Sequence, residues 1–141
     1  LIDDVDALVY LANLGTIPLH VLACREKTRH EADFLTIDFD IGEHPFERAV
    51  VLALTLREIL HEIGLVGYPK TSGQKGLHVL VPWTAKGGYS EARTWAERIA
   101  EQVVEAVPDQ ATIERSKAKR GRRVYVDVMQ NAEGKHAVAA A

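Results

Sequence analysis

The fold is easiest to infer from residues 34–41, which read Phe-Leu-Thr-Ile-Asp-Phe-Asp-Ile in a chain of 141 residues. Successive side chains of a β-strand point to opposite faces of its sheet. One face of this segment would therefore be wholly apolar, with Leu35, Ile37, Phe39 and Ile41. The other face would carry Thr36, Asp38 and Asp40. The pattern predicts a strand that packs on a hydrophobic core and presents two carboxylates on its opposite face.

Asp38 and Asp40 would lie close enough to repel each other, because their Cα atoms are about 6.6–6.8 Å apart along a strand. A divalent cation with oxygen ligands would remove this repulsion. An Asp-x-Asp pair alone is a weak signal, because most such pairs are simply the solvated face of an edge strand. A metal site therefore needs support from elsewhere in the chain.

That support comes from residues 123–129, where apolar and polar side chains alternate again. Val124, Val126 and Val128 would be buried, and the opposite face would carry Arg123, Tyr125, Asp127 and Met129. A lone carboxylate in an apolar strand is costly and needs a partner. If this strand pairs beside residues 34–41, then Asp38, Asp40 and Asp127 converge. Three carboxylates are the smallest protein contribution to a two-metal site for phosphoryl or nucleotidyl transfer.

A turn rich in small residues lies between the two acidic segments. Residues 71–78 read Thr-Ser-Gly-Gln-Lys-Gly-Leu-His. Glycines let backbone N–H groups approach an anion, while Ser72 and Lys75 offer a hydrogen bond and a charge. The turn lacks the spacing of a Walker A loop, and an ordinary hairpin with a solvated lysine is the alternative. His20 is expected to be either a hydrogen-bonded core residue or a contact to a nucleotide sugar or phosphate.

The remaining pattern indicates strands mixed with two long helices, which is typical of an α/β or α+β sandwich. A chain of this length is expected to form a single domain over residues 1–141. Helices are predicted over 3–14, 46–63 and 90–107. Further strands are predicted over 17–24, 65–69, 77–82, 111–115 and 136–141.

Composition excludes several classes of protein. Hydrophobic residues make up 47% and charged residues 26%, and the single cysteine, Cys24, rules out an internal disulfide. These values favour a globular protein of a reducing cytosol. We expect no membrane segment, because no apolar run approaches the ~18 residues that a spanning helix needs.

The net charge of −3 hides a dense basic segment. Residues 115–123 contain six cations and no anion, whereas the rest of the chain has 11 cations against 20 anions. A mildly acidic body with one basic segment points to a polyanion that binds at one place. A solvated, mobile loop is the alternative.

Taken in order, these segments resemble the polymerase domain of bacterial DNA ligase D. This domain belongs to the archaeo-eukaryotic primase superfamily and serves non-homologous end joining. The resemblance lies in four strings spread over nearly the whole chain, at residues 13–25, 34–50, 68–82 and 113–139. They read NLGTIPLHVLACR, FLTIDFDIGEHPFERAV, YPKTSGQKGLHVLVP and IERSKAKRGRRVYVDVMQNAEGKHAVA.

The resemblance implies a two-layer primase-polymerase fold, in which a mixed or antiparallel sheet carries the acids and packs on helices. It implies that Asp38, Asp40 and Asp127 are catalytic and bind two Mn²⁺ or Mg²⁺ ions. The implied nucleotide-binding residues are Ser72, Lys75, Gly76, His78 and His20. The implied DNA-binding residues are Lys117, Lys119, Arg120, Arg122 and Arg123.

The same resemblance implies an enzyme that adds NTPs or dNTPs to a primer at broken or gapped DNA ends. Its expected partners are DNA, a ligase domain in the parent chain and a Ku-type end-binding protein, and its expected location is the cytoplasm. The family domain extends beyond both Leu1 and Ala141, so we expect a truncated catalytic core without the 5′-phosphate grip. Gln74 departs from the family, which more often has a second small residue there.

Two other functions use the same residues. A metal-dependent nuclease or phosphohydrolase would use the three acids with water as the nucleophile. A non-catalytic nucleic-acid-binding module would keep the basic segment with a degenerate site, although the intact set of acids counts against it.

Overall fold

The computed structural model of the chain describes residues 2–73, 76–84 and 87–138. Along the chain run α1 (Val5–Asn13), β1 (His20–Leu22), a 3-10 turn η1 (Glu26–Thr28), β2 (Phe34–Asp40), α2 (Glu47–Glu62) and β3 (Tyr68–Thr71). They are followed by β4 (Gly76–Pro82), α3 (Gly88–Ala106), β5 (Ala111–Thr112), α4 (Lys117–Arg120), β6 (Val124–Asp127) and β7 (His136–Val138). No helix in these ranges is long and apolar enough to cross a membrane.

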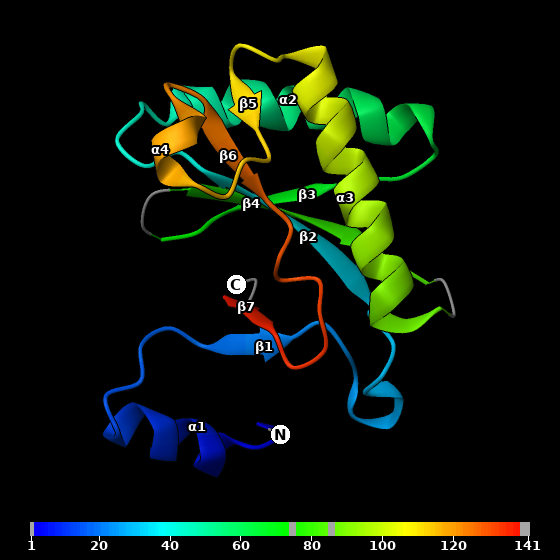
Figure 1. Cartoon of the computed structure of the whole chain (residues 1–141). Helices are drawn as coiled ribbons and strands as arrows, with labels where there is room; N and C mark the ends of the chain where they lie inside the picture. Colours follow the sequence, from blue (N-terminus) through cyan, green and yellow to red (C-terminus); the bar gives the residue numbers. More distant parts are fainter. Residues whose placement is uncertain (1, 74–75, 85–86, 139–141) are drawn as a thin grey trace.

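The centre of the molecule is a five-stranded sheet with the order β3-β4-β2-β6-β5 (Figure 1). Neighbouring strands are antiparallel except for β5 and β6, which run parallel. A separate antiparallel ribbon of β1 and β7 lies below this sheet in Figure 1, with α1 beyond it. The predicted mixed sheet is therefore confirmed.

One face of the sheet is covered by α2 and α3 (Figure 1). The apolar side of β2 is completely buried there, with Leu35, Ile37 and Phe39 at 0% exposure, as predicted. The facing helices contribute fully buried side chains at a spacing of about one turn, namely Leu52, Leu56 and Leu60 from α2 and Ile99 and Val103 from α3. This arrangement is the expected two-layer α/β fold, and it leaves the opposite face of the sheet for polar side chains.

The long helix α2 ends where the sequence predicts. Gly64 adopts a left-handed backbone with a φ of 75°, a conformation in which glycine is favoured because it has no Cβ. The amide of Leu65 then donates to the carbonyl of Leu60 at 2.8 Å, and the amide of Gly64 donates to His61. These bonds satisfy the carbonyls that a helix end leaves free.

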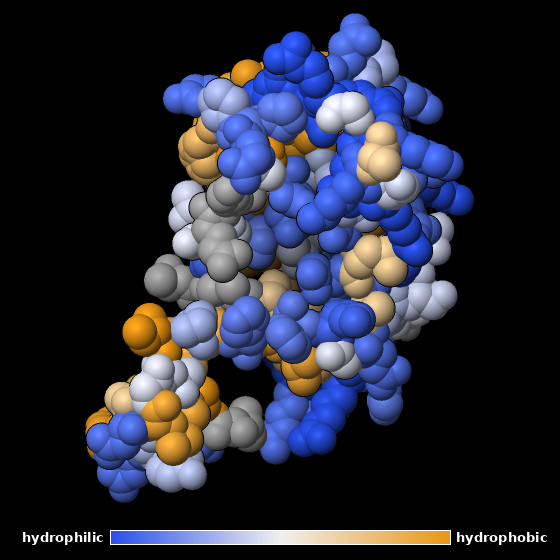
Figure 2. All heavy atoms as spheres, turned by 60° about the vertical axis from the view of Figure 1, so that its left-hand side comes forward, coloured by the Kyte–Doolittle hydropathy of each residue, from blue (hydrophilic) through white to orange (hydrophobic). Residues whose placement is uncertain are grey.

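The N-terminal part of the chain differs from the prediction. The strand expected over 17–24 is only three residues long and pairs with β7, not with the central sheet. Val21 and Leu22 are 41% and 48% exposed, because each strand of a two-stranded ribbon has only one neighbour. α1 buries none of its residues, and apolar side chains lie on the surface of its lobe at the bottom of Figure 2.

Two further segments are shifted or reorganised. The strand expected over 65–69 is displaced toward the C-terminus, to Tyr68–Thr71, where it pairs with β4. The basic segment, for which a solvated loop was the alternative, contains the single-turn helix α4. Gly121 follows this helix with a φ of 60°, which lets the chain turn directly into β6.

Candidate functional site

The polar face of the sheet carries a row of four titratable side chains that crosses four strands. Lys70 of β3 lies opposite His78 of β4, and His78 lies opposite Asp38 of β2. Asp38 in turn lies opposite Asp127 of β6. Directly opposed residues have Cβ atoms about 4.5–5.5 Å apart and point to the same face. The row therefore runs from a cationic end to a paired carboxylate end.

The predicted pairing of the two acidic strands is thus confirmed by the register. Asp40 lies two residues beyond Asp38 on the same face, opposite Tyr125. All three acids are half-buried. Like charges directly opposite each other destabilise a sheet. The Asp38–Asp127 pair is therefore a position where folding alone would not favour two carboxylates, as expected of a functional site.

Asp38 is held closely by the β3–β4 hairpin. Its Oδ2 lies 3.5 Å from Nε2 of His78. A Cβ atom added to Gly76 would lie 3.4 Å from Oδ1 of Asp38 and 2.9 Å from the carbonyl oxygen of Phe39. The same atom would lie 3.4 Å from Oγ of Ser72. Glycine at position 76 therefore lets the hairpin approach the carboxylate, and it brings Ser72 next to Asp38.

Asp40 faces the basic segment. Its Oδ1 accepts from the amide of Gly42 at 3.2 Å, and its Oδ2 lies 3.6 Å from Nη1 of Arg120. The guanidinium carbon of Arg120 lies 3.8 Å from the ring centroid of Tyr125. Burial raises the pKa of Tyr125, and the charge of Asp127 raises it further, so the phenol stays neutral beneath the arginine. Arg120 is thereby fixed between an acid and an aromatic ring.

Asp127 is positioned by the turn that follows β6. Its Oδ1 accepts from the amide of Met129 at 2.7 Å. Asn131, which is only 3% exposed, accepts from the amide of Thr36 and donates to the carbonyls of Thr36 and Val128 at 2.7–2.8 Å. Its side chain thus continues the pairing of β2 after β6 has ended. Asn131 was not among the residues selected from the sequence, and no signal in a single sequence marks this role.

The donor chemistry of the three acids fits a divalent cation such as Mn²⁺ or Mg²⁺, since hard cations prefer oxygen ligands. Within the described ranges, no three His, Cys, Asp or Glu side chains are gathered into a group that could hold a metal ion. Each carboxylate has a partner of its own in the fold, namely His78 for Asp38, Arg120 for Asp40 and the amide of Met129 for Asp127. Each keeps free lone pairs, because a carboxylate has about four acceptor sites.

A large cavity of about 1360 Å³ opens on this face. It brings together five of the residues predicted from the sequence, namely Asp38, Asp40, His20, Ser72 and His78. Lys75 was also selected, but it lies outside the described residues. His20 is exposed, so the alternative that it is a core residue is wrong.

Two lysines also line this cavity. Lys117 was expected to contact DNA, whereas Lys70 was not selected at all. Lys70 is half-buried, and its Nζ donates to the carbonyl of Thr71 at 3.2 Å. Lys70 lies two residues before Ser72 in the string at 68–82. Alternation of side chains along the strand, which places Lys70 and Ser72 on one face, was the signal that could have identified it.

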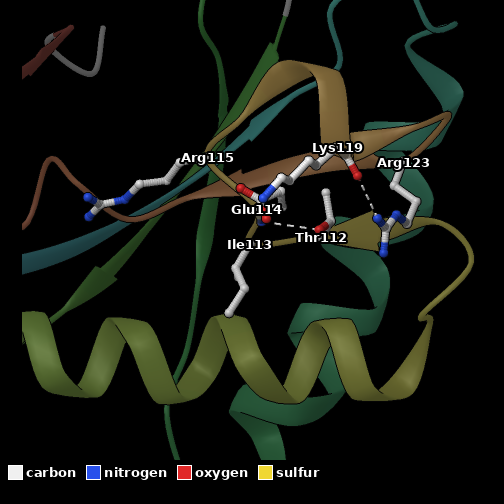
Figure 3. Close-up of a pocket in the computed structure, with 6 residues that line it drawn as sticks. All are labelled: Thr112, Ile113, Glu114, Arg115, Lys119 and Arg123. Atoms are coloured by element: carbon white, nitrogen blue, oxygen red, sulfur yellow. Dashed lines mark hydrogen bonds between the residues drawn. The ribbon is translucent and has the colours of Figure 1, made fainter.

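The arginines of the basic segment largely hold the segment itself together. Arg123 donates to the carbonyls of Arg120 and Lys119 at 3.0 Å, and the second bond is drawn in Figure 3. Arg120 donates to the carbonyls of Glu114 and Arg115 at 2.9 Å. Charge-assisted bonds of this kind satisfy the free carbonyls around a short helix. Arg120 and Arg123 thus stabilise the backbone of the basic segment.

The same segment borders an open pocket of about 520 Å³ on the outer side of β5. Arg115, Lys119 and Arg123 line it, and the side chain of Arg115 extends away from the other two in Figure 3. Nη2 of Arg115 lies 2.6 Å from the sulfur of Met129. In the part of the chain that the structure describes, the side chains of Lys117, Lys119 and Arg122 show no hydrogen bond or ion pair. These three cations are available to a polyanion.

Comparison with known proteins identifies the family. The model of the LigD primase-polymerase domain matches residues 1–140. The chain belongs to the LigD primase-polymerase domain family. A bifunctional non-homologous end joining protein LigD from Bacillus subtilis is 34% identical over 135 residues. The match covers 94% of this chain and 22% of that protein. A multifunctional LigD from Pseudomonas aeruginosa is 31% identical over 99% of this chain and 17% of its own length.

A solved structure supports the same assignment. The polymerase domain of Mycobacterium tuberculosis ligase D, in complex with DNA, matches with a TM-score of 0.86 and 29% identity. The match covers 97% of this chain and 51% of that domain. The chain thus spans about a fifth of the curated LigD proteins and about half of the solved polymerase domain. The family and the fold implied by the resemblance are both confirmed.

Proposed function

We propose that this chain is the catalytic core of a DNA-directed nucleotidyltransferase of non-homologous end joining. It would add NTPs or dNTPs to a primer 3′-hydroxyl at broken or gapped DNA ends. The observation that carries the proposal is the row Lys70–His78–Asp38–Asp127, in which cationic and acidic ends share one face beside a cavity. A nucleoside triphosphate needs both ends, because its phosphates are anionic and its reacting phosphorus needs metal-bound charge.

Asp38, Asp40 and Asp127 would hold two Mn²⁺ or Mg²⁺ ions. When bound, such ions lower the pKa of an attacking hydroxyl and stabilise the charge that develops on phosphorus. The carboxylates themselves would fix the positions of the two ions. The free lone pairs of Asp40 would face the cation, and Arg120 would stay in place even without the ion pair, because its guanidinium also contacts two backbone carbonyls and the ring of Tyr125.

Ser72 and His78 would contact the triphosphate, with Gly76 allowing the close approach of the hairpin. Lys75 completes this set by resemblance, and Lys70 joins it because it lies at the cationic end of the row. His20 would contact the nucleotide from the opposite wall of the cavity, on the β1–β7 ribbon.

DNA would bind along the basic segment. Lys117, Lys119 and Arg122 would contact phosphates directly, whereas Arg120 and Arg123 would act mainly by holding the segment in shape. Such contacts are sequence-independent. A ligase domain in the parent chain, a Ku-type end-binding partner and a cytoplasmic location follow from membership of the family and belong to the proposal.

The decisive experiment compares Asp38→Asn with wild type in two assays on the 141-residue chain. Wild type should bind a nucleoside triphosphate in the presence of Mn²⁺, and the variant should lose this binding. Without metal, the variant should be as stable as wild type or more stable, because one of two opposed charges is removed. Glu105→Gln, an exposed acid on α3, is the matched control and should bind normally.

Titrations of the chain with Mn²⁺, with a free triphosphate and with DNA separate the alternatives. A nuclease would bind DNA and metal but show no affinity for a free triphosphate. A non-catalytic module would bind DNA through the basic segment but would bind neither Mn²⁺ nor a free triphosphate, in wild type and in Asp38→Asn alike. Either result would overturn the proposed polymerase.

A further inference from the structure

We propose that His136 is a positioning residue that fixes the ring of His20 for contact with the nucleotide, an inference that rests on the function proposed above. Neither the sequence motifs nor the resemblance selects His136. Three observations carry the inference: the register of the β1–β7 ribbon, the contact between the two rings, and the place of His20 in the cavity.

The register puts both histidines on one face of the ribbon. His20 lies opposite Val138, and Leu22 lies opposite His136. His20 and His136 are therefore diagonal neighbours, separated by two residues along β7. Diagonal neighbours share a face, and their separation of about 7–8 Å at Cα is within reach of aromatic side chains.

The two rings make a defined contact. Nδ1 of His20 lies 3.1 Å from Nδ1 of His136. The rings meet edge to face, with centroids 4.9 Å apart and an interplanar angle of 81°. A hydrogen bond between two ring nitrogens requires one N–H donor and one lone pair, so the pair forces opposite states on the two Nδ1 atoms.

Only one of the two histidines faces the cavity. His20 lines it together with Asp38 and Asp40, whereas His136 is not among its described lining residues. Because Nδ1 of His20 faces His136, Nε2 is the nitrogen left for a ligand. Oxygens of a phosphate accept hydrogen bonds, so the productive form of His20 carries its proton on Nε2. His136 must then donate from Nδ1 to His20.

Removal of His136 should therefore act through His20. In His136→Ala, the His20 ring can rotate and exchange tautomers, and the bound nucleotide must order it. The net worth of one hydrogen bond corresponds to a roughly 2- to 10-fold loss of affinity for Mn²⁺–NTP. His136→Asn should restore most of this affinity, because its carboxamide N–H can replace the Nδ1–H donor.

The test combines spectroscopy and a double-mutant cycle on the whole 141-residue chain. Ring-nitrogen NMR of the metal-free protein should show one tautomer of His20, protonated at Nε2, in wild type and a mixture in His136→Ala. In the titration with Mn²⁺ and NTP, His136→Ala should weaken binding in the wild-type background and have no further effect in His20→Ala. His30→Ala is the control, because His30 pairs with Glu133 and does not touch His20.

The outcomes are distinguishable from those of the proposed function. An unchanged His20 spectrum in His136→Ala, or additive effects in the cycle, would show that His136 does not position His20. A wild-type chain that fails to bind Mn²⁺–NTP at all would instead overturn the proposed function, and the contact to the nucleotide would fall with it.

Discussion

The central sheet and the β1–β7 ribbon supply the two walls of the same cavity, but they are stabilised in different ways. In the central sheet, the inner strands β4, β2 and β6 have neighbours on both sides, and α2 and α3 cover the apolar face. In the ribbon, each strand has one neighbour, and Val21 and Leu22 are substantially exposed. Asp38 and Asp40 therefore lie on a wall that the core supports, and His20 lies on a wall whose stability depends on local contacts.

The largest contrast should appear when equivalent leucines are truncated. Leu52 of α2 is fully buried, whereas Leu22 of β1 is 48% exposed. Leu52→Ala should lower the free energy of unfolding by about 2–5 kcal/mol, because it leaves a cavity in the core. Leu22→Ala should change it by about 0.5 kcal/mol or less. Chemical denaturation of both variants measures the two values, and equal losses would show that the ribbon is packed as tightly as the sheet.

The second contrast concerns two asparagines. Asn131 makes three buried hydrogen bonds to β2 and to the turn after β6, whereas Asn13 is exposed at the end of α1. Asn131→Ala leaves buried backbone groups without partners, at about 1–3 kcal/mol for each such group. Thermal unfolding should therefore show a clear loss for Asn131→Ala.

Asn13→Ala is the matched control and should stay within about 0.5 kcal/mol of wild type. Because Asn131 continues the register that sets Asp38 opposite Asp127, Asn131→Ala should also weaken Mn²⁺ binding at temperatures where it is folded. If Asn131→Ala is destabilised but binds Mn²⁺ normally, then Asn131 stabilises the fold without setting the positions of the acids.

The same contrast explains what could be read from the sequence. Residues 34–41 and 123–129 have different surroundings on their two faces, so alternation predicted which side chains pack against the helices. The pairing of the two strands was only a condition of the expected metal site, because alternation within one strand does not identify its neighbour or its register. β1 has no such asymmetry, and its apolar residues led to an expected strand of eight residues where three are paired. The roles of Asn131 and Arg120 depend on contacts across 95 and 80 residues, which no local pattern reveals.

A third contrast concerns Lys70, which lies at the cationic end of the row Lys70–His78–Asp38–Asp127. Lys70→Ala should weaken binding of Mn²⁺–NTP by roughly 10- to 100-fold, the usual effect of losing a charge-assisted hydrogen bond to phosphate. Lys27→Ala, on the exposed turn η1, is the control. The difference should appear for a triphosphate and shrink for a monophosphate with the same base. An equal effect on both would place Lys70 away from the phosphates.

The smallest expected effect concerns DNA and the basic segment. Six cations lie in residues 115–123, but Arg120 and Arg123 bond to backbone carbonyls and Arg115 lies beside Met129. If only Lys117, Lys119 and Arg122 contact phosphates of a duplex, the slope of log affinity against log salt should be about −2.7, at ~0.9 per contact. Arg122→Ala should reduce the magnitude of the slope by ~0.9, the value for one contact, and leave the free energy of unfolding unchanged.

Arg123→Ala should lower the free energy of unfolding while changing the slope less, because its guanidinium bonds to backbone carbonyls of the segment. A slope near −5.4, which is about that for six contacts, would show that these arginines exchange their carbonyl partners for phosphates when DNA binds.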